Sequence, residues 1–166
     1  MKLRKIKLNL FIMVLCLSTI SLPARASLTI DITLWLDNAT PIAIVPFGWR
    51  GVGKVPMRMT EVISNDLSRS GQFAPMKENE MIELPHEGRD VTFPTWRNLN
   101  QKYIVVGKIQ LQGKDSYQVQ FQLLDVEKGT QMTGHSFQAK ENQLRRLSHH
   151  ISDLIYEAIT GERGAF

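Results

Sequence analysis

Strand-like and helix-like patterns of apolar residues alternate along this chain, and this alternation constrains its fold most strongly. Residues 42–47 form a short, continuous apolar run, which is typical of a strand buried on both faces. Apolar residues then recur at helical spacing between Pro56 and Gly71, and again from about Asn142 to Thr160. We therefore predict an α/β fold, consisting of a single domain with a mixed β-sheet and two main helices.

The segment between the two helices contains the remaining predicted strands. The clearest is around residues 117–123, where apolar side chains alternate with three glutamines, as in a strand with one solvated face. A glycine-rich loop is expected at residues 48–54, and a polar loop with one helical turn at 77–93. Further strands are predicted at 73–76, 103–111 and near 131–138, and a short helix at 95–100.

The first 26 residues have the pattern of a secretory signal peptide. Four cationic residues stand at its start (Lys2, Arg4, Lys5 and Lys7), and an apolar run follows at residues 8–22. The run of about fifteen residues is shorter than the ~20 that a transmembrane helix needs. Ala24-Arg25-Ala26 then supplies the A-x-A pattern of a signal-peptidase site. We predict cleavage between Ala26 and Ser27, and no membrane span afterwards.

Removal of this segment changes the composition that matters for function. The chain has 20 basic and 16 acidic residues, and the loss of five basic ones leaves 15 against 16. A basic footprint for nucleic acid is therefore not expected. The only cysteine, Cys16, leaves with the signal, so neither a disulfide nor a thiolate metal site is predicted. Leu15 before it argues against lipidation. A short signal and no remaining cysteine favour a periplasmic protein.

One segment imitates a phosphate-binding loop. Gly48, Gly53 and Lys54 have the spacing of that motif, between a predicted strand and a predicted helix. However, Val55 replaces the serine or threonine that would bind magnesium, and Pro56 removes a backbone donor at the start of the helix. We do not predict nucleotide binding.

Histidines and carboxylates offer little further chemistry. Adjacent histidines on a helix point about 100° apart, so His149 and His150 cannot hold one metal ion together. His149 and Asp153 are spaced to pair on a solvated helix face. The polar loop also contains carboxylates that are interpreted as solvated surface: Glu78, Glu80 and Glu83. We predict no catalytic, metal-binding or cofactor-binding residues, and no enzyme.

The segment at residues 27–40 is the most unusual part of the predicted secreted chain, and we call it the arm. Apolar residues alternate along it, which indicates an extended strand with one apolar edge. Two interpretations remain open: an edge strand packed on the domain, or a detachable strand that adds to the sheet of a partner. The side chains predicted to contact such a partner are Leu28, Ile30, Ile32, Leu34 and Trp35.

Several segments together resemble the amino-terminal domain of the TolB family, from the Tol–Pal system of the bacterial envelope. The resemblance covers essentially all of residues 27–166. It is carried by Pro41–Trp49, Asp66–Phe73, Tyr103–Gly107, Asp153–Glu157 and Thr160–Phe166, in that order.

This resemblance implies an α/β domain at residues 41–166 and a non-enzymatic role in outer-membrane integrity and cell division. In the family, the arm binds TolA, an inner-membrane protein, so a TolA-like partner is implied for residues 27–38. The stretch Thr33–Leu36 is more apolar here than is usual in the family. The family continues after the equivalent of Phe166 into a β-propeller that binds Pal, so Pal is not an expected partner of these 166 residues. The alternative is a truncated, impaired form or an envelope assembly factor with other partners.

Overall fold

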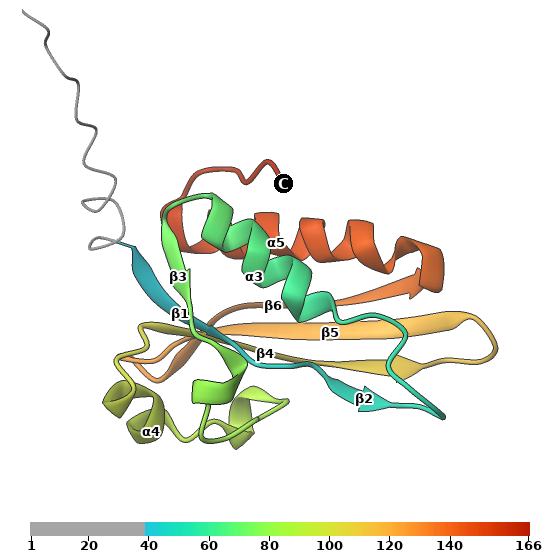
Figure 1. Cartoon of the computed structure of the whole chain (residues 1–166), viewed down its shortest axis with the longest axis horizontal. Coiled ribbons are helices and arrows are strands. Elements are labelled where there is room, and N and C mark those ends of the chain that lie inside the picture. Colours follow the sequence, from blue (N-terminus) through green and yellow to red (C-terminus); the bar gives the residue numbers. More distant parts are fainter. Residues whose placement is uncertain (1–38) are drawn as a thin grey trace, which may run out of the picture. The chain divides into compact units, whose positions relative to one another are not determined.

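The computed structural model describes residues 39–166, which form one mixed sheet with helices on both faces (Figure 1). The strand order is β3-β1-β4-β5-β6, and the short β2 pairs with β4 beyond the end of β1. Strands β1, β2, β3 and β4 are parallel where they pair, whereas β4, β5 and β6 form an antiparallel meander. The predicted α/β class with a mixed sheet is therefore confirmed.

The elements lie close to their predicted positions. The strands are β1 (Thr40–Ile44), β2 (Gly48–Arg50), β3 (Phe73–Pro75), β4 (Tyr103–Leu111), β5 (Ser116–Asp125) and β6 (Thr130–Lys140). The helices are α3 (Met59–Arg69), α4 (Phe93–Asn98) and α5 (Leu144–Thr160). Single 3-10 turns occupy Glu78–Glu80, Gly88–Asp90 and Glu141–Gln143. The prediction of two main helices holds, with α4 as a short third one.

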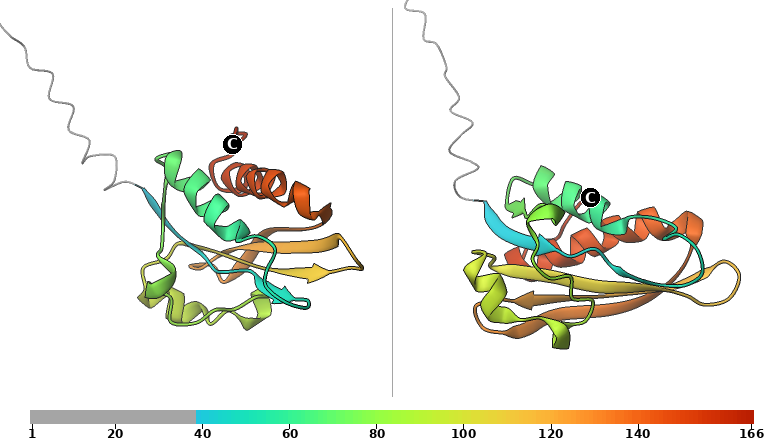
Figure 2. Two further views of the ribbon diagram at one scale, coloured as in Figure 1. Left: turned by 45° about the vertical axis from the view of Figure 1, so that its right-hand side comes forward. Right: turned by 60° about the horizontal axis from the view of Figure 1, so that its bottom comes forward.

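Helices α3 and α5 cover one face of the sheet, and α4 lies with the 76–99 segment on the other (Figures 1 and 2). The face covered by α3 and α5 contains the larger core, which includes Ile42 and Ile44 of β1. The smaller core on the opposite face includes Ala43, Val45 and the fully buried Trp96 of α4. The continuous apolar run of β1 thus reflects burial on both faces.

The predicted glycine-rich loop at 48–54 is wrong at its start, because Gly48–Arg50 form β2. Strand β4 extends beyond β1, and its residues Lys108–Gln110 pair with these three in parallel. A side chain at position 48 would not fit, since a Cβ there would lie 2.7 Å from the ring of His86. Lys54 is exposed, and α3 does not begin until Met59. The loop therefore does not lead directly into a helix start as a phosphate loop does.

Candidate functional site

The residues predicted to bind a partner lie in the arm, outside the described residues. Within residues 39–166, the polar groups concentrate in two places. One is a hollow on the sheet face opposite α3 and α5, and the other is a buried cluster between these two helices.

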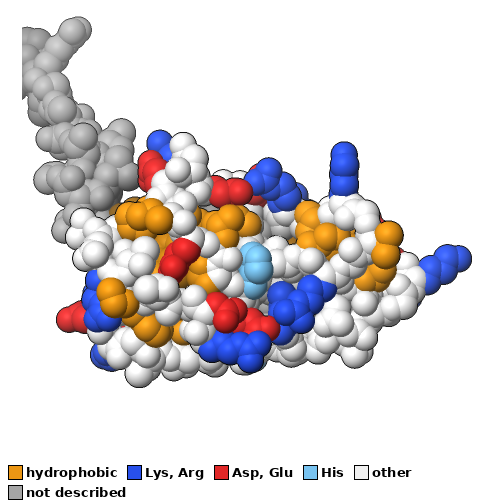
Figure 3. All heavy atoms as spheres, turned by 90° about the horizontal axis from the view of Figure 1, so that it is seen from below, with side chains coloured by type: hydrophobic (Ala, Val, Ile, Leu, Met, Phe, Trp, Pro, Cys, Tyr) orange, Lys and Arg blue, Asp and Glu red, His pale blue; other side chains and the backbone are white. Residues whose placement is uncertain are grey.

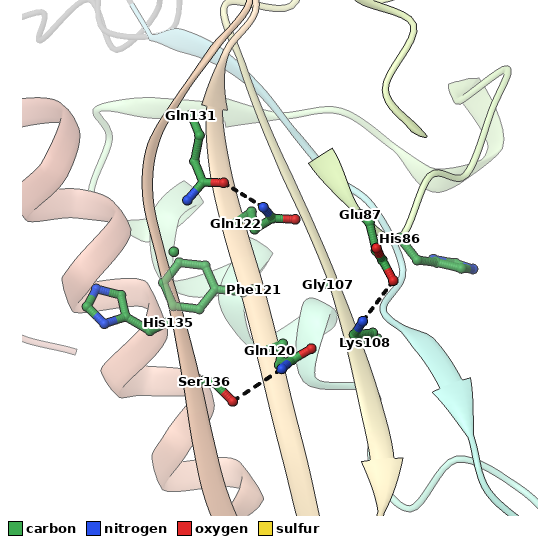
Figure 4. A pocket seen from close by; sticks show the side chains of 11 residues that line it. His86, Glu87, Gly107, Lys108, Gln120, Phe121, Gln122, Gln131, His135 and Ser136 are labelled. Atoms are coloured by element: carbon green, nitrogen blue, oxygen red, sulfur yellow. Dashed lines mark hydrogen bonds and ion pairs between the residues drawn. The ribbon is translucent and has the colours of Figure 1, made fainter. Parts of the chain in front are cut away.

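The hollow on the sheet has a volume of about 390 Å³ and lies over β4, β5 and β6 (Figure 4). It exists because α4 and its flanking segment cover only part of this face, which leaves the glutamines of β5 half-exposed. Charged side chains of both signs gather on the same face (Figure 3). Its lining includes Glu87, Lys108, Gln120, Gln122, Gln131 and Ser136.

Glu87 is the centre of the charged group in this hollow. Its carboxylate lies 2.7 Å from Lys108 Nζ and 2.7 Å from Arg89 Nη2, with Arg50 at 3.7 Å. The hydrogen bond from Lys108 lowers the pKa of Glu87 below its ordinary value of 4.5. Burial acts in the opposite direction, but the nearby cationic charges add to the lowering. Glu87 is therefore held as a carboxylate, which suits an ion-pair partner and not a general acid at neutral pH.

The amide side chains of the hollow hydrogen-bond to one another, to the backbone or to a neighbouring hydroxyl. Gln122 accepts a bond from the Gly88 amide at 2.8 Å and donates to Gln131 at 2.5 Å. Gln120 donates to the Ser136 hydroxyl at 3.4 Å, whereas His86 points away from the Glu87–Lys108 pair (Figure 4). The Gly88–Gln122 bond and the Glu87–Lys108 pair fasten the 86–90 segment to the sheet, whereas the other two bonds join β5 to β6. We interpret these contacts as a structural junction between β5, β6 and the 86–90 segment.

The charges around Glu87 lead to a prediction about acid stability. A carboxyl with a lowered pKa stabilises the fold above its unfolded pKa, and this contribution is lost as the pH falls through the folded value. We expect the wild-type protein to lose more stability between pH 7 and pH 3 than the Glu87→Gln variant does. Urea unfolding at both pH values measures this difference.

The matched control for this prediction is Glu162→Gln, which changes an exposed glutamate in the same way. It should keep the wild-type response to pH. A carbon-detected NMR titration provides the direct test, since Glu87 should titrate below 4.5. A midpoint at or above that value would contradict the role given to Lys108.

The second polar cluster joins α3 to α5 through a buried carboxylate. The side chain of Asp66 is 1% exposed, and its Oδ2 lies 2.7 Å from His149 Nδ1 and 2.9 Å from Ser152 Oγ. Its Oδ1 accepts a hydrogen bond from Arg69. An ionised carboxylate only accepts hydrogen bonds, so both His149 Nδ1 and the Ser152 hydroxyl donate to it. Three donors thus compensate the burial of one charge.

The predicted pairing of His149 with Asp153 is wrong, because His149 turns inward to Asp66. His149 and Asp66 are 83 positions apart in the chain and come into contact through the packing of α3 on α5. Asp153 instead accepts a hydrogen bond from the Phe166 amide at 3.0 Å. The helical spacing permitted the local pair, but the buried carboxylate of Asp66 requires donors more strongly than the half-exposed Asp153 does.

The cluster contains the residue types of a catalytic triad in an order that cannot act as one. In a triad the histidine stands between serine and aspartate, so that it removes the hydroxyl proton. Here the aspartate stands between Ser152 and His149, and the hydroxyl is fully buried. We interpret the cluster as a structural link between two helices.

Glu83 also differs from its prediction as a solvated carboxylate. It accepts hydrogen bonds from Trp96 Nε1 at 2.6 Å and from the Thr92 amide at 3.1 Å. Glu78 remains at the surface, where it pairs with Arg58 at 2.9 Å. Among residues 39–166, no three side chains of the metal-binding types are grouped so that they could hold an ion. None of the helices described there is long and apolar enough to cross a membrane.

Comparisons with known proteins agree on one family. The sequence model described as the TolB amino-terminal domain matches residues 28–132. A Tol–Pal system protein TolB from Thioalkalivibrio sulfidiphilus is 48% identical over 146 residues, which cover 87% of this chain and 34% of that protein. One from Xanthomonas oryzae is 44% identical over 92% of this chain and 35% of that protein. The chain thus spans about a third of the length of these curated relatives.

Solved structures give the same fold. The crystal structure of TolB from Acinetobacter baumannii matches with a TM-score of 0.64 and 30% identity, over 77% of this chain and 30% of that one. The LpoB C-terminal domain from Salmonella enterica matches with a TM-score of 0.51 and 14% identity, over 62% of this chain and 84% of that one. The second likeness concerns the fold alone.

Proposed function

Since this chain belongs to the TolB family by its amino-terminal domain, we propose that it acts in the Tol–Pal system as a non-enzymatic module for protein–protein interaction. The observation that carries this proposal is the family match over residues 28–132, which includes most of the arm and the greater part of the sheet. The structural roles of the Glu87 and Asp66 clusters support a binding protein over an enzyme. We further propose that the protein acts in the periplasm after cleavage at Ala26, and serves outer-membrane integrity and cell division.

The mechanism we propose is donation of the arm as a strand to a TolA-like partner. The support lies in the sequence of the arm, where apolar residues alternate with polar ones as a strand with one apolar face requires. In strand addition, backbone hydrogen bonds supply affinity and every second side chain supplies selectivity. The selective contacts then fall on Leu28, Ile30, Ile32 and Leu34, with Trp35 on the other face.

Deletion of residues 27–37 is expected to abolish binding to the periplasmic end of TolA, measured by calorimetry. The physical reason is that the deletion removes every proposed contact while residues 39–166 keep their sheet and cores. Circular dichroism and thermal unfolding of the deletion variant check that the domain still folds. Unchanged affinity after the deletion would overturn the proposed mechanism.

Two single substitutions test the alternation directly. Ile30→Asp places a charge on the apolar face of the arm and is expected to weaken TolA binding by about tenfold or more. Thr29→Asp adds the same charge to the opposite face and serves as the matched control, with a smaller effect. Equal losses in both variants would argue against a strand whose apolar face supplies most of the contacts.

A further inference from the structure

Strand β6 leaves one edge of the sheet open. It is the last strand in the order of the sheet, and within the described part of the chain it pairs only with β5. Its 11 residues include no proline, and most of its side chains are exposed. Such an edge presents a row of backbone donors and acceptors to an added strand. The opposite edge strand, β3, has only three residues and ends in Pro75, which cannot donate a backbone hydrogen bond.

A hollow of about 350 Å³ lies beside this open edge, between β6 and the first half of α5. Phe137 and Ala139 of the strand and Leu147 of the helix give it an apolar lining. Phe137 is half-buried, and its ring meets the ring of His150 edge-on, with the centroids 5.6 Å apart. The edge of β6, the first half of α5 and the hollow between them form a groove, and the 11 residues of β6 give it the length of an extended segment.

The charge around this groove is of one sign. Among residues 39–166, the titratable residues that line it are Arg146 and His150, and no carboxylate from that part of the chain does so. An adjoining hollow of about 490 Å³ shares these two residues and adds Arg145 and His149. The acidic side chain that the described residues contribute to that second hollow, Asp153, accepts the hydrogen bond from the Phe166 amide. A complementary occupant therefore carries carboxylates.

We propose that the groove between β6 and the first half of α5 binds an extended, acidic segment of a partner protein as an added strand. The backbone of that segment pairs with the open edge of β6, and its alternate side chains enter the apolar hollow against Phe137 and Leu147. A carboxylate on the segment pairs with Arg146 at the rim. This mode of recognition combines a sheet edge for affinity with side-chain pockets for selectivity.

The groove beside β6 is a different binding site from the one proposed in the arm. The arm donates a strand, whereas the groove accepts one, and the two use different residues. Deletion of residues 27–37 is expected to leave the groove intact, and a substitution at Arg146 is expected to leave binding by the arm intact. The failure of one proposal can thus be told from the failure of the other.

The experiment uses two synthetic peptides of about nine residues, a length that matches a strand. In the first, valine alternates with threonine and glutamate, and in the second, glutamine replaces glutamate. Each is titrated into the isotope-labelled protein and followed by NMR. We expect shifts confined to residues 130–140 and 143–150, and about threefold tighter binding of the glutamate peptide.

Two variants test where this preference originates. The Arg146→Gln variant should bind both peptides with the same affinity, because it lacks the guanidinium that pairs with the glutamate carboxylate. Arg97→Gln, which changes an exposed arginine on α4 in the same way, should keep the preference. Methylating the amide nitrogens of one alternate set of peptide residues should abolish binding, whereas methylating the other set should not. No binding, shifts over β4 and the β5 glutamines, or an unchanged preference in Arg146→Gln would overturn the proposal.

Discussion

Replacement of Trp96 by alanine is expected to lower the free energy of unfolding by about 3–5 kcal/mol. Its side chain is fully buried and fills the smaller core between α4 and the sheet, together with Val91, Leu124 and Val126. The substitution leaves a cavity and also removes the indole donor that binds Glu83. Because a typical domain is stable by only 5–15 kcal/mol, this loss is a large part of the total. Urea unfolding followed by circular dichroism measures it.

The Trp96→Phe variant separates packing from hydrogen bonding. Phenylalanine keeps most of the apolar volume but cannot donate to the carboxylate of Glu83, which among the described residues then keeps the Thr92 amide as its donor. We expect a loss of about 1–3 kcal/mol. A Trp96→Phe loss as large as that of Trp96→Ala would show that the hydrogen bond outweighs packing at this position, contrary to our expectation.

A sequence pattern predicts structure that depends on neighbouring residues, and it misses structure that depends on residues distant in the chain. The run at 42–47 and the alternation at 117–123 predicted strands correctly, because the order of apolar and polar residues along a strand indicates which of its faces are buried. The sequence did not predict the hydrogen bonds of the Glu83 side chain or the short strand β2. Glu83 binds Trp96, and β2 pairs with Lys108–Gln110. These partners are too distant in the chain for the local periodicity of apolar residues to predict the contacts.

The functional predictions divide in the same manner. The family could be predicted from five segments of sequence, because each retains a recognisable local pattern. Arm contacts such as Ile30 and Ile32 stay predictions, since they lie outside the described residues. The groove beside β6 could not be predicted, because it depends on β6 being the last strand of the sheet and on α5 lying along it. Strand order is a property of the fold as a whole.

Asp66 gives the second large effect that we expect. Asp66→Ala removes a buried charge that holds His149 and Ser152 of α5 and Arg69 of α3, so the link between the helices is lost. The expected decrease in the free energy of unfolding is about 3–5 kcal/mol, the cost of breaking a buried charged pair by removal of one partner. Urea unfolding measures it. Asp90→Ala, at an exposed aspartate, is the matched control and should change stability by less than about 0.5 kcal/mol.

A milder variant keeps this prediction testable if Asp66→Ala does not fold. Asp66→Asn retains the shape of the side chain but replaces one acceptor oxygen by a donor, which then faces the donors of α5 or of Arg69. We expect a loss of about 1–3 kcal/mol. His149→Ala should cost less than Asp66→Ala, because His149 is 27% exposed and its loss leaves the carboxylate with Ser152 and Arg69. If Asp66→Asn matched the wild type, the packing of α3 on α5 would rest on apolar contacts alone, and the buried carboxylate would not be the link between the helices.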